Sequence, residues 1–201
     1  MGAAGNGELR VVMLGAPGCG KGTQAERLAA AYGIPAISTG EMLRAAVAAG
    51  SELGRKVQSV MAQGALVDDE LMAEVVRERL AHGDAARGFL LDGYPRTAAQ
   101  AGTLEEVIRD AGKSLDHVLY LDVPEDVLVE RALGRGRADD TAAVVRERLR
   151  VYRDSTEPLV EHYRHRGLLR TVRGDQSVDA VAAELQRVID GKGSGQAETV
   201  R

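Results

Sequence analysis

The chain has 201 residues, of which 44% are hydrophobic and 28% are charged, which fits a globular protein with one sizeable core or two small ones. A formal net charge of −4, one Phe and no Trp argue against a nucleic-acid surface built from basic patches and stacking aromatic rings. One cysteine rules out an intrachain disulfide, and the lack of a ~20-residue apolar run or a signal-peptide core leads us to expect a cytoplasmic protein with no membrane segment.

Short apolar runs alternate with helical patterns between two polar tails. Residues 1–8 are predicted to be a disordered N-terminal tail and residues 191–201 a flexible C-terminal tail. The predicted strands, each short and largely apolar, are 9–14, 34–37, 88–92, 116–122 and 168–173. The predicted helices are 22–32, 40–49, 52–63, 69–81, 97–111, 125–133, 141–166 and 178–190. This alternation predicts an α/β fold in which helices cover both faces of a central five-stranded parallel sheet.

Two segments depart from the alternation of strands and helices. Residues 38–67 hold two consecutive helical patterns with no strand between them, which indicates an insertion. Residues 134–140, GRGRADD, form a charged, glycine-containing loop between two predicted helices. Ser38 and Glu41 match a capping box at the start of the insertion, and Pro124 suits the first turn of the helix that follows it.

The most informative motif is the stretch 15–24, GAPGCGKGTQ, between a predicted strand and a predicted helix. Glycines let successive backbone N–H groups point at one anion, and the helix N-terminus adds partial positive charge there. Lys21 adds a full charge, so the motif is typical of a phosphate-binding loop. Gly22 stands where such loops commonly have Ser or Thr, and Thr23 comes one place later, which weakens the case for a hydroxyl that ligates Mg²⁺ directly.

Several arginines fall where the predicted fold places them near this loop. Ligands bind at the carboxyl ends of the strands in an open parallel sheet, and Asp92 and Arg96 follow a predicted strand. Arg44 opens the insertion, while Arg137 and Arg148 lie in and after the charged loop. Because a guanidinium binds phosphate through two hydrogen bonds and stays charged, this arrangement favours phosphoryl transfer by positioned cations.

From about residue 9 to residue 189, the chain closely resembles an adenylate kinase. The motifs that carry the resemblance are GAPGCGKGTQ (15–24), ISTGEMLR (37–44), GALV (64–67), FLLDGYPR (89–96) with Gln100, GRGRADD (134–140) and RERL (146–149). The resemblance implies a P-loop NTPase-type fold of three αβα layers. It also implies reversible transfer of the terminal phosphoryl group of Mg-ATP to AMP, which gives two ADP. Nothing in the sequence demands a dimer, so we expect a monomer whose ligands are ATP, AMP, ADP and Mg²⁺.

The resemblance assigns a role to each matching position. The residues expected to bind ATP are Gly18, Cys19, Gly20, Lys21, Gly22, Thr23, Arg131, Arg135 and Gly174. The residues expected to bind AMP are Thr39, Arg44, Ala65, Leu66, Val67, Gly93, Tyr94, Pro95, Arg96, Gln100, Arg137 and Arg148. Lys21, Arg96, Arg137 and Arg148 are the expected catalytic cations. Gln100 would read the edge of the adenine of AMP, and Asp92 would organise the water shell of Mg²⁺.

The resemblance also divides the chain into units. The core would consist of 9–37, 68–133 and 141–190, with 38–67 as the AMP-binding unit and 134–140 as a short lid. The short lid lacks the longer insertion that carries a zinc site in some relatives. Closure of the two small units over both nucleotides would keep water away from the transferred group.

The sequence leaves two other functions open. One is a kinase for another monophosphate, such as UMP or CMP, although Thr39 and Gln100 favour AMP by resemblance. The other is a catalytically silent nucleotide-binding protein, which the presence of Lys21 together with Arg44, Arg96, Arg137 and Arg148 argues against.

Cys19 and two histidines have alternative interpretations. Cys19 either simply fits the glycine loop or is a thiol that the helix N-terminus activates and ATP shields. His162 and His165 have the spacing of a metal pair on a helix, but no third ligand is clearly placed to join them, so we expect no zinc site.

Overall fold

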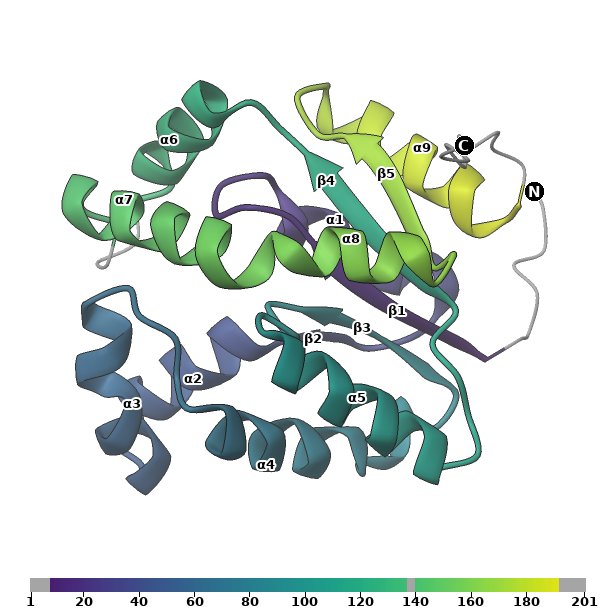
Figure 1. Cartoon of the computed structure of the whole chain (residues 1–201), viewed down its shortest axis with the longest axis horizontal. Coiled ribbons are helices and arrows are strands. Elements are labelled where there is room, and N and C mark those ends of the chain that lie inside the picture. The colour runs from purple at the N-terminus through teal and green to yellow at the C-terminus, as the bar shows by residue number, and fades with distance from the viewer. Residues whose placement is uncertain (1–7, 137–139, 192–201) are drawn as a thin grey trace.

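The computed structural model of the chain describes residues 8–136 and 140–191. In this part of the chain, five strands form one sheet in the order β2-β3-β1-β4-β5, and all neighbouring strands are parallel (Figure 1). The strands are β1 (Leu9–Leu14), β2 (Ala36–Ser38), β3 (Gly88–Asp92), β4 (His117–Asp122) and β5 (Leu169–Arg173). The predicted α/β class with a central five-stranded parallel sheet is confirmed.

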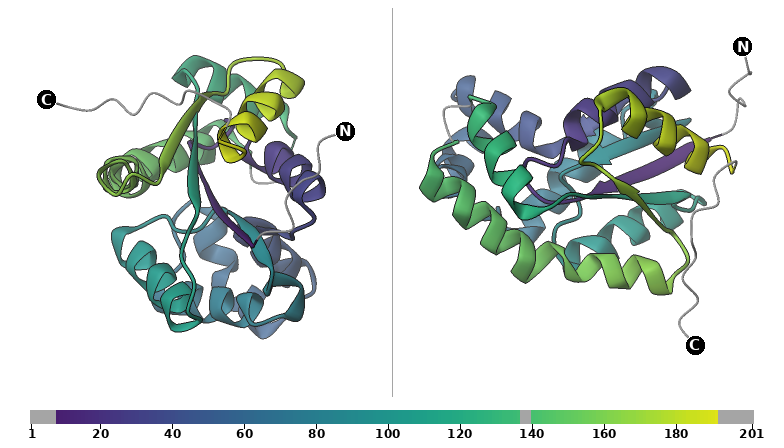
Figure 2. Two further views of the ribbon diagram at one scale, coloured as in Figure 1. Left: turned by 90° about the vertical axis from the view of Figure 1, so that its right-hand side faces the viewer. Right: turned by 90° about the horizontal axis from the view of Figure 1, so that it is seen from above.

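Helices cover both faces of the sheet, so the molecule has three layers (Figure 2). The helices that contribute to the core on the first face are α1 (Lys21–Tyr32), α6 (Glu125–Gly134), α7 (Ala142–Val151) and α9 (Val178–Ile189). Those that contribute on the second face are α2 (Thr39–Ala48), α3 (Glu52–Ala62), α4 (Asp69–Leu80), α5 (Ala98–Asp110) and α8 (Pro158–His165). A short 3₁₀ turn, η1 (Gly83–Ala85), precedes β3.

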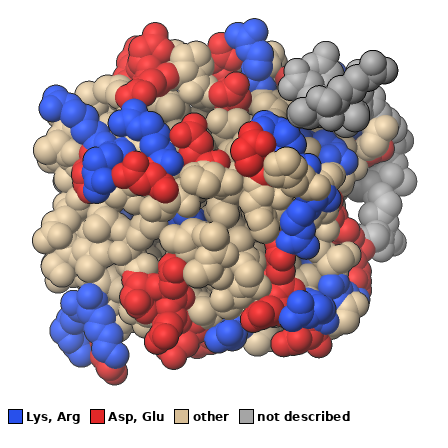
Figure 3. All heavy atoms as spheres, in the orientation of Figure 1, with Lys and Arg blue, Asp and Glu red and all other residues tan. Residues whose placement is uncertain are grey.

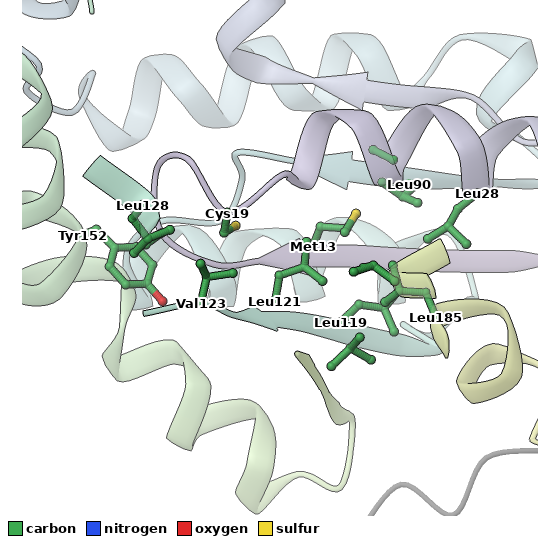
Figure 4. Packing of buried hydrophobic residues seen from close by; sticks show 14 of the residues in the cluster. Met13, Cys19, Leu28, Leu90, Leu119, Leu121, Val123, Leu128, Tyr152 and Leu185 are labelled. Carbon is green, nitrogen blue, oxygen red and sulfur yellow. The ribbon is translucent and has the colours of Figure 1, made fainter. Parts of the chain in front are cut away.

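The core consists of two apolar clusters, one on each face of the sheet. Successive residues of a strand point to opposite faces. Val11 and Met13 of β1 therefore join the first cluster, and Val12 and Leu14 join the second. Figure 4 shows part of the first cluster, between the sheet and helices α1 and α9. Because both faces are covered, the central strands are largely apolar, which is why the sequence predicts them well.

The predicted helix 141–166 is present as a continuous helical run, but it is not one regular α-helix. Between α7 and α8 lies a π-helical segment, η2 (Tyr152–Thr156), in which the N–H of Glu157 donates to the carbonyl of Tyr152 at 2.8 Å. Pro158 follows directly and has no N–H to donate to a carbonyl one turn earlier. The run extends from the ends of the strands back along the sheet to β5 (Figure 1).

Three local predictions differ from the structure. The second strand is 36–38 rather than 34–37, and it runs directly into α2. The predicted capping box is wrong, because Ser38 occupies the N-cap position of α2 without a side-chain cap hydrogen bond and still pairs with β3 through Asp92. Pro124 lies at the N-cap of α6 rather than in its first turn.

The surface carries charges of both signs. Figure 3 shows Lys and Arg interspersed with Asp and Glu over one face of the molecule. Among the residues that the structure describes, no helix is long and apolar enough to cross a membrane.

Candidate active site

The carboxyl ends of the strands surround a cavity of about 510 Å³. Its walls come from the glycine loop after β1, the start of α2, the segment after β3, the turn between α3 and α4, and helices α6 and α7. These elements are far apart in the sequence and meet here because parallel strands all end at the same edge of the sheet.

The glycine loop turns tightly where a side chain could not fit. Gly18 has φ +92°, and a Cβ on it would lie 2.4 Å from the carbonyl oxygen of Leu128 on α6. Gly20, at φ +98°, is the N-cap of α1, so the first N–H groups of that helix face the loop. The loop therefore combines a helix N-terminus with backbone donors, which is the geometry that binds phosphate.

Lys21 lies folded over the glycine loop. Its Nζ donates to the carbonyls of Gly15 at 2.7 Å and Ala16 at 3.1 Å, and it lies 3.5 Å from the Sγ of Cys19. The ammonium group can exchange these neutral carbonyl partners for the charged oxygens of a phosphate, which bind it more strongly.

Cys19 contributes more to packing than to the cavity surface. It is 2% exposed and belongs to the first apolar cluster, where Figure 4 places its sulfur above the sheet near Val123 and Leu128. Its burial favours the interpretation in which the residue simply fits the loop.

On the opposite side of the cavity, Thr39 and Arg44 come from α2. Thr39 is 1% exposed and donates from Oγ1 to the carbonyl of Asp92 at 3.4 Å, which ties the start of α2 to the end of β3. The Arg44 guanidinium lies over the first turn of its own helix, with Nη1 3.3 Å from where a Cβ on Gly40 would be. Both residues line the cavity.

Arg96 is held rigidly in the segment after β3. Its Nε donates to the carbonyl of Gly93 at 2.7 Å, and its own carbonyl accepts from Thr156 Oγ1 at 2.9 Å. Gly93 has φ +83°, and a Cβ on it would lie 3.1 Å from Nη2 of Arg96. The guanidinium is therefore fixed by the backbone beneath it before any ligand arrives.

The charges around Arg96 indicate an anion site. Burial lowers the pKa of the Arg96 guanidinium, the carboxylate of Asp92 raises it, and the positive charges of Arg148 and Arg44 lower it further. Three guanidinium groups from three different elements thus lie close enough to repel one another. An anion bound among them would relieve this repulsion.

Gln100 lies at the start of α5 and is 3% exposed. Its Oε1 accepts from the backbone N–H of Arg96 at 2.8 Å, and its Nε2 donates to Oδ1 of Asp69 at 2.7 Å. The other oxygen of Asp69 accepts from Thr97 Oγ1 at 3.0 Å. The amide of Gln100 is therefore fixed from two sides while the residue borders the cavity.

At the other end of the cavity, Arg131 and Gly174 are joined directly. Nη1 of Arg131 donates to the carbonyl of Gly174 at 2.9 Å, so the end of α6 contacts the turn after β5. Gln24, which is 3% exposed, donates from Nε2 to the carbonyl of Val178 at 2.9 Å and holds the start of α9 against α1.

Arg135 and Arg148 share one carboxylate. Asp140, whose side chain is 1% exposed, accepts from Arg135 at 2.7 and 2.9 Å and from Nη1 of Arg148 at 3.0 Å. The carboxylate keeps both guanidinium groups at the edge of the cavity. Arg137 lies outside the described residues, so its expected position is not tested.

The residues at the glycine loop fit a magnesium ion that arrives with a nucleotide. Asp92 lines the cavity, and its Oδ2 lies 3.7 Å from where a Cβ on Gly22 would be. Gly22 itself has no hydroxyl, and no group of three or more His, Cys, Asp or Glu residues that could hold a metal occurs in 8–136 and 140–191. One carboxylate beside a phosphate site suits Mg²⁺, which keeps several water ligands.

His162 has partners other than a metal. It lies 3.4 Å from Oε1 of Glu105 on α5, and the same carboxylate pairs with Arg166. This cluster joins α5 to α8, away from the cavity.

The structure brings together nearly all the site residues expected from the sequence. Within the described residues, those that line the one cavity are Gly18, Cys19, Gly20, Lys21, Gly22, Thr23, Arg131, Arg135, Gly174, Thr39, Arg44, Ala65, Leu66, Val67, Asp92, Gly93, Pro95, Arg96, Gln100 and Arg148. Tyr94 is the exception, because it is 1% exposed and packs in the second apolar cluster. Its burial, together with the nearby charge of Asp69, raises the pKa of its hydroxyl to about 12.

Sequence reasoning missed three residues that hold the site in place. Asp69, Asp140 and Gln24 each hydrogen-bond to a residue or turn that lines the cavity. Asp140 and Gln24 lie within the motifs GRGRADD and GAPGCGKGTQ, so their positions in the sequence could have indicated a role at the site. Asp69 carried no signal of its own, because its partner lies 31 residues away.

A glycine loop before α1, faced by three arginines across one cavity, defines an α/β protein with a phosphate-binding loop. The adenylate kinase family model matches residues 13–168, more than half of the chain. An adenylate kinase of Xanthomonas euvesicatoria pv. vesicatoria is 49% identical over 185 residues, which cover 90% of this chain and 99% of that relative. Adenylate kinase 1 of a Synechocystis species is 47% identical over 179 residues, which cover 89% of this chain and 96% of the relative. The chain belongs to the adenylate kinase family.

Proposed function

We propose that this chain transfers the terminal phosphoryl group of Mg-ATP to AMP, with both nucleotides in the one cavity. The observation that carries the proposal is that Arg44, Arg96 and Arg148 line the same cavity as Lys21. Two phosphate-binding regions that face each other allow the donor and acceptor oxygens to line up around the transferred group.

ATP takes the side of the glycine loop in this proposal. The backbone N–H groups of Gly18 to Thr23 and the Nζ of Lys21 hold its phosphates. The adenine lies near Arg131 and Gly174, whose hydrogen bond fixes a flat cationic group beside the turn after β5. Arg135 contributes from the end of α6.

AMP takes the opposite side. Its phosphate binds Arg44 and Arg96, and its base lies near Gln100 and the apolar wall formed by 65–67. Since Arg96 is fixed by the carbonyl of Gly93, little side-chain entropy is lost when it binds phosphate.

The transferred group passes between these two regions. Arg148, with Arg137 as expected from the sequence, would stabilise the charge that spreads over the phosphoryl oxygens. The segment 38–67 would be the AMP-binding unit and 134–140 a short lid, which together exclude water. Asp92 would hold Mg²⁺ through water, and the ion, when bound with ATP, neutralises charge on the phosphate oxygens.

We also propose that the enzyme works as a monomer in the cytoplasm. In support, the glycine loop and the arginines that face it all come from a single chain.

Initial-rate assays with Mg-ATP and each of AMP, CMP, UMP and GMP test the proposal. We expect kcat/KM for AMP to exceed that for each other acceptor by at least about 100-fold, because the site rejects GMP and UMP by their hydrogen-bonding edge and CMP by the smaller size of its base. A preference for UMP or CMP would instead support the pyrimidine-nucleotide kinase. A chain that binds nucleotides and transfers nothing would support the silent protein.

A further inference from the structure

The amide of Gln100 lies between two groups that can each bind only one of its ends. A carboxylate accepts hydrogen bonds and cannot donate them, whereas a backbone N–H only donates. Asp69 contacts the nitrogen of the amide at 2.7 Å, and the N–H of Arg96 contacts its oxygen at 2.8 Å. Rotating the amide by half a turn would place oxygen against the carboxylate and N–H against N–H.

Asp69 reaches Gln100 because of where it lies in α4. It is the first residue of that helix, while the preceding Asp68 caps the helix by accepting from the N–H groups of Glu70 and Leu71. Asp69 is therefore not needed to cap α4. One of its oxygens accepts from Gln100 of α5, and the other accepts from Thr97, which is the N-cap of α5. The hydroxyl of Thr97 in turn accepts from the N–H of Gln100 at 3.1 Å.

These contacts use only half of the amide. Gln100 has a second lone pair on Oε1 and a second hydrogen on Nε2. Together they suit a base that presents a donor opposite the oxygen and an acceptor opposite the nitrogen. An amino group beside an unprotonated ring nitrogen, as in adenine, has this pattern. A carbonyl beside a ring N–H, as in hypoxanthine and guanine, has the reverse pattern.

We infer that Asp69 is a positioning residue that determines base specificity: it holds the amide of Gln100 in one orientation and so selects amino purine monophosphates over oxo purine monophosphates. The inference rests on the proposed function, in which Gln100 faces the base of AMP. It goes further by naming the residue that sets the order of donor and acceptor on Gln100. Cytosine offers the same pattern as adenine, so discrimination against CMP comes from the size of the base and not from Asp69.

The test compares AMP with inosine monophosphate as acceptors, at saturating Mg-ATP, for the wild type and Asp69→Asn. Asparagine keeps the shape of the side chain but adds a donor, so position 69 can then bind either end of the Gln100 amide, and only the N–H of Arg96 still favours one orientation. We expect the ratio of kcat/KM for AMP to that for inosine monophosphate to fall about tenfold or more, because a hydrogen bond to a charged group is lost. The KM for ATP is expected to stay unchanged.

Asp68→Asn is the matched control, since it makes the same change one residue earlier and Asn caps helices as well as Asp. It is expected to keep the wild-type ratio of kcat/KM for AMP to that for inosine monophosphate. An Asp69→Asn enzyme that also keeps the wild-type ratio, or a control that loses it to the same extent, would overturn the inference.

Gln100→Ala separates this inference from the proposed function. If it raises the KM for AMP and Asp69→Asn does not change the ratio, the role of Asp69 is wrong and the placement of AMP stands. If Gln100→Ala leaves the KM for AMP unchanged, the placement of the base is wrong, and the inference fails with it. When Asp69→Asn is added to Gln100→Ala, we expect no further change in the ratio of kcat/KM for AMP to that for inosine monophosphate, because the amide that Asp69 orients is already absent.

Discussion

Lys21 is expected to bind a phosphate, but in the structure its ammonium group contacts its own loop. Its ammonium group bonds to two carbonyls of its own loop, at 2.7 and 3.1 Å. Both partners are neutral and belong to a loop whose shape is set by glycines, so the loop does not depend on the lysine charge for its fold. Losing Lys21 should therefore affect transfer more than stability.

Lys21→Met is expected to lower kcat by about 10³-fold or more, which is the scale of a lost cation at a phosphoryl-transfer site. Thermal unfolding measured with the rates should show a midpoint close to that of the wild type. Lys56→Met is the control, because Lys56 forms an exposed pair with Glu52 on α3 and should keep wild-type turnover. Wild-type kcat in the Lys21 variant would refute the assigned role.

At the residue scale, the residues expected to contact a ligand are easier to predict from the sequence than the residues that hold those side chains in place. Arg44 and Arg96 stand out because the sequence places one in the segment 38–67 and the other after a predicted strand, beside the expected phosphate site. Asp69 does not stand out, because an acidic residue in the first turn of a helix is ordinary and only the packing of α4 against α5 gives it a partner.

At the scale of elements, helices α2 and α3 are packed closely through one glycine. A Cβ on Gly54 of α3 would lie 2.1 Å from the carbonyl oxygen of Ala46 and 2.7 Å from the Cα of Val47. Both contacts are with backbone, which cannot move aside as a flexible side chain can. Because α2 carries Thr39 and Arg44, the position of α3 influences the proposed AMP side of the cavity.

Gly54→Ala is expected to lower the free energy of unfolding by about 1–3 kcal/mol, the usual cost of overpacking, and to raise the KM for AMP more than that for ATP. Gly102→Ala in α5 is the matched control, because a Cβ there meets nothing within 4 Å. It should be neutral or more stable by up to about 1 kcal/mol. Equal unfolding midpoints for the two variants in a denaturant titration would contradict the close packing.

The extents of the elements follow from local pattern, but their internal details do not. The insertion 38–67 contains α2 and α3 as predicted, since two amphipathic patterns follow each other without an apolar run between them. The π-helical segment within the long helical run is not visible in the hydrophobic pattern. It depends on which carbonyl the N–H of Glu157 finds just before Pro158.

At the scale of the whole molecule, His117 links folding to pH. It lies at the start of β4, where burial lowers its pKa below the ordinary 6.5; Arg170 lowers it further and Asp116 raises it. The unfolded chain therefore takes up a proton at a higher pH than the folded chain does. Stability is unaffected by this group above about pH 6.5 and decreases as the pH falls below that value.

His117→Gln is expected to reduce the loss of unfolding free energy between pH 7.5 and pH 5.5, measured by urea titration at each pH. His82→Gln, at an exposed histidine, is the control and should keep the wild-type loss. A steeper or unchanged loss in the His117 variant would contradict the assignment.

The strand content of the whole molecule is predictable, whereas the order of its strands is not. Each apolar run is seen in the sequence because both faces of the sheet are covered. The order β2-β3-β1-β4-β5 places β3 beside β1 although α1, β2, the segment 38–67, α4 and η1 separate them in the chain. That choice depends on long-range packing, and it is what brings the segment 92–96 next to the glycine loop.

Transfer of an isotopic label tests the central claim most directly, which is that one cavity passes a phosphoryl group straight from ATP to AMP. The chain is incubated with Mg-ATP labelled in its terminal phosphate and unlabelled AMP, and the products are separated. We predict that in the initial phase, before the reverse reaction contributes, all transferred label appears in the outer phosphate of ADP, with two ADP formed for each AMP consumed. Label released as inorganic phosphate, or retained on the protein, would contradict the account.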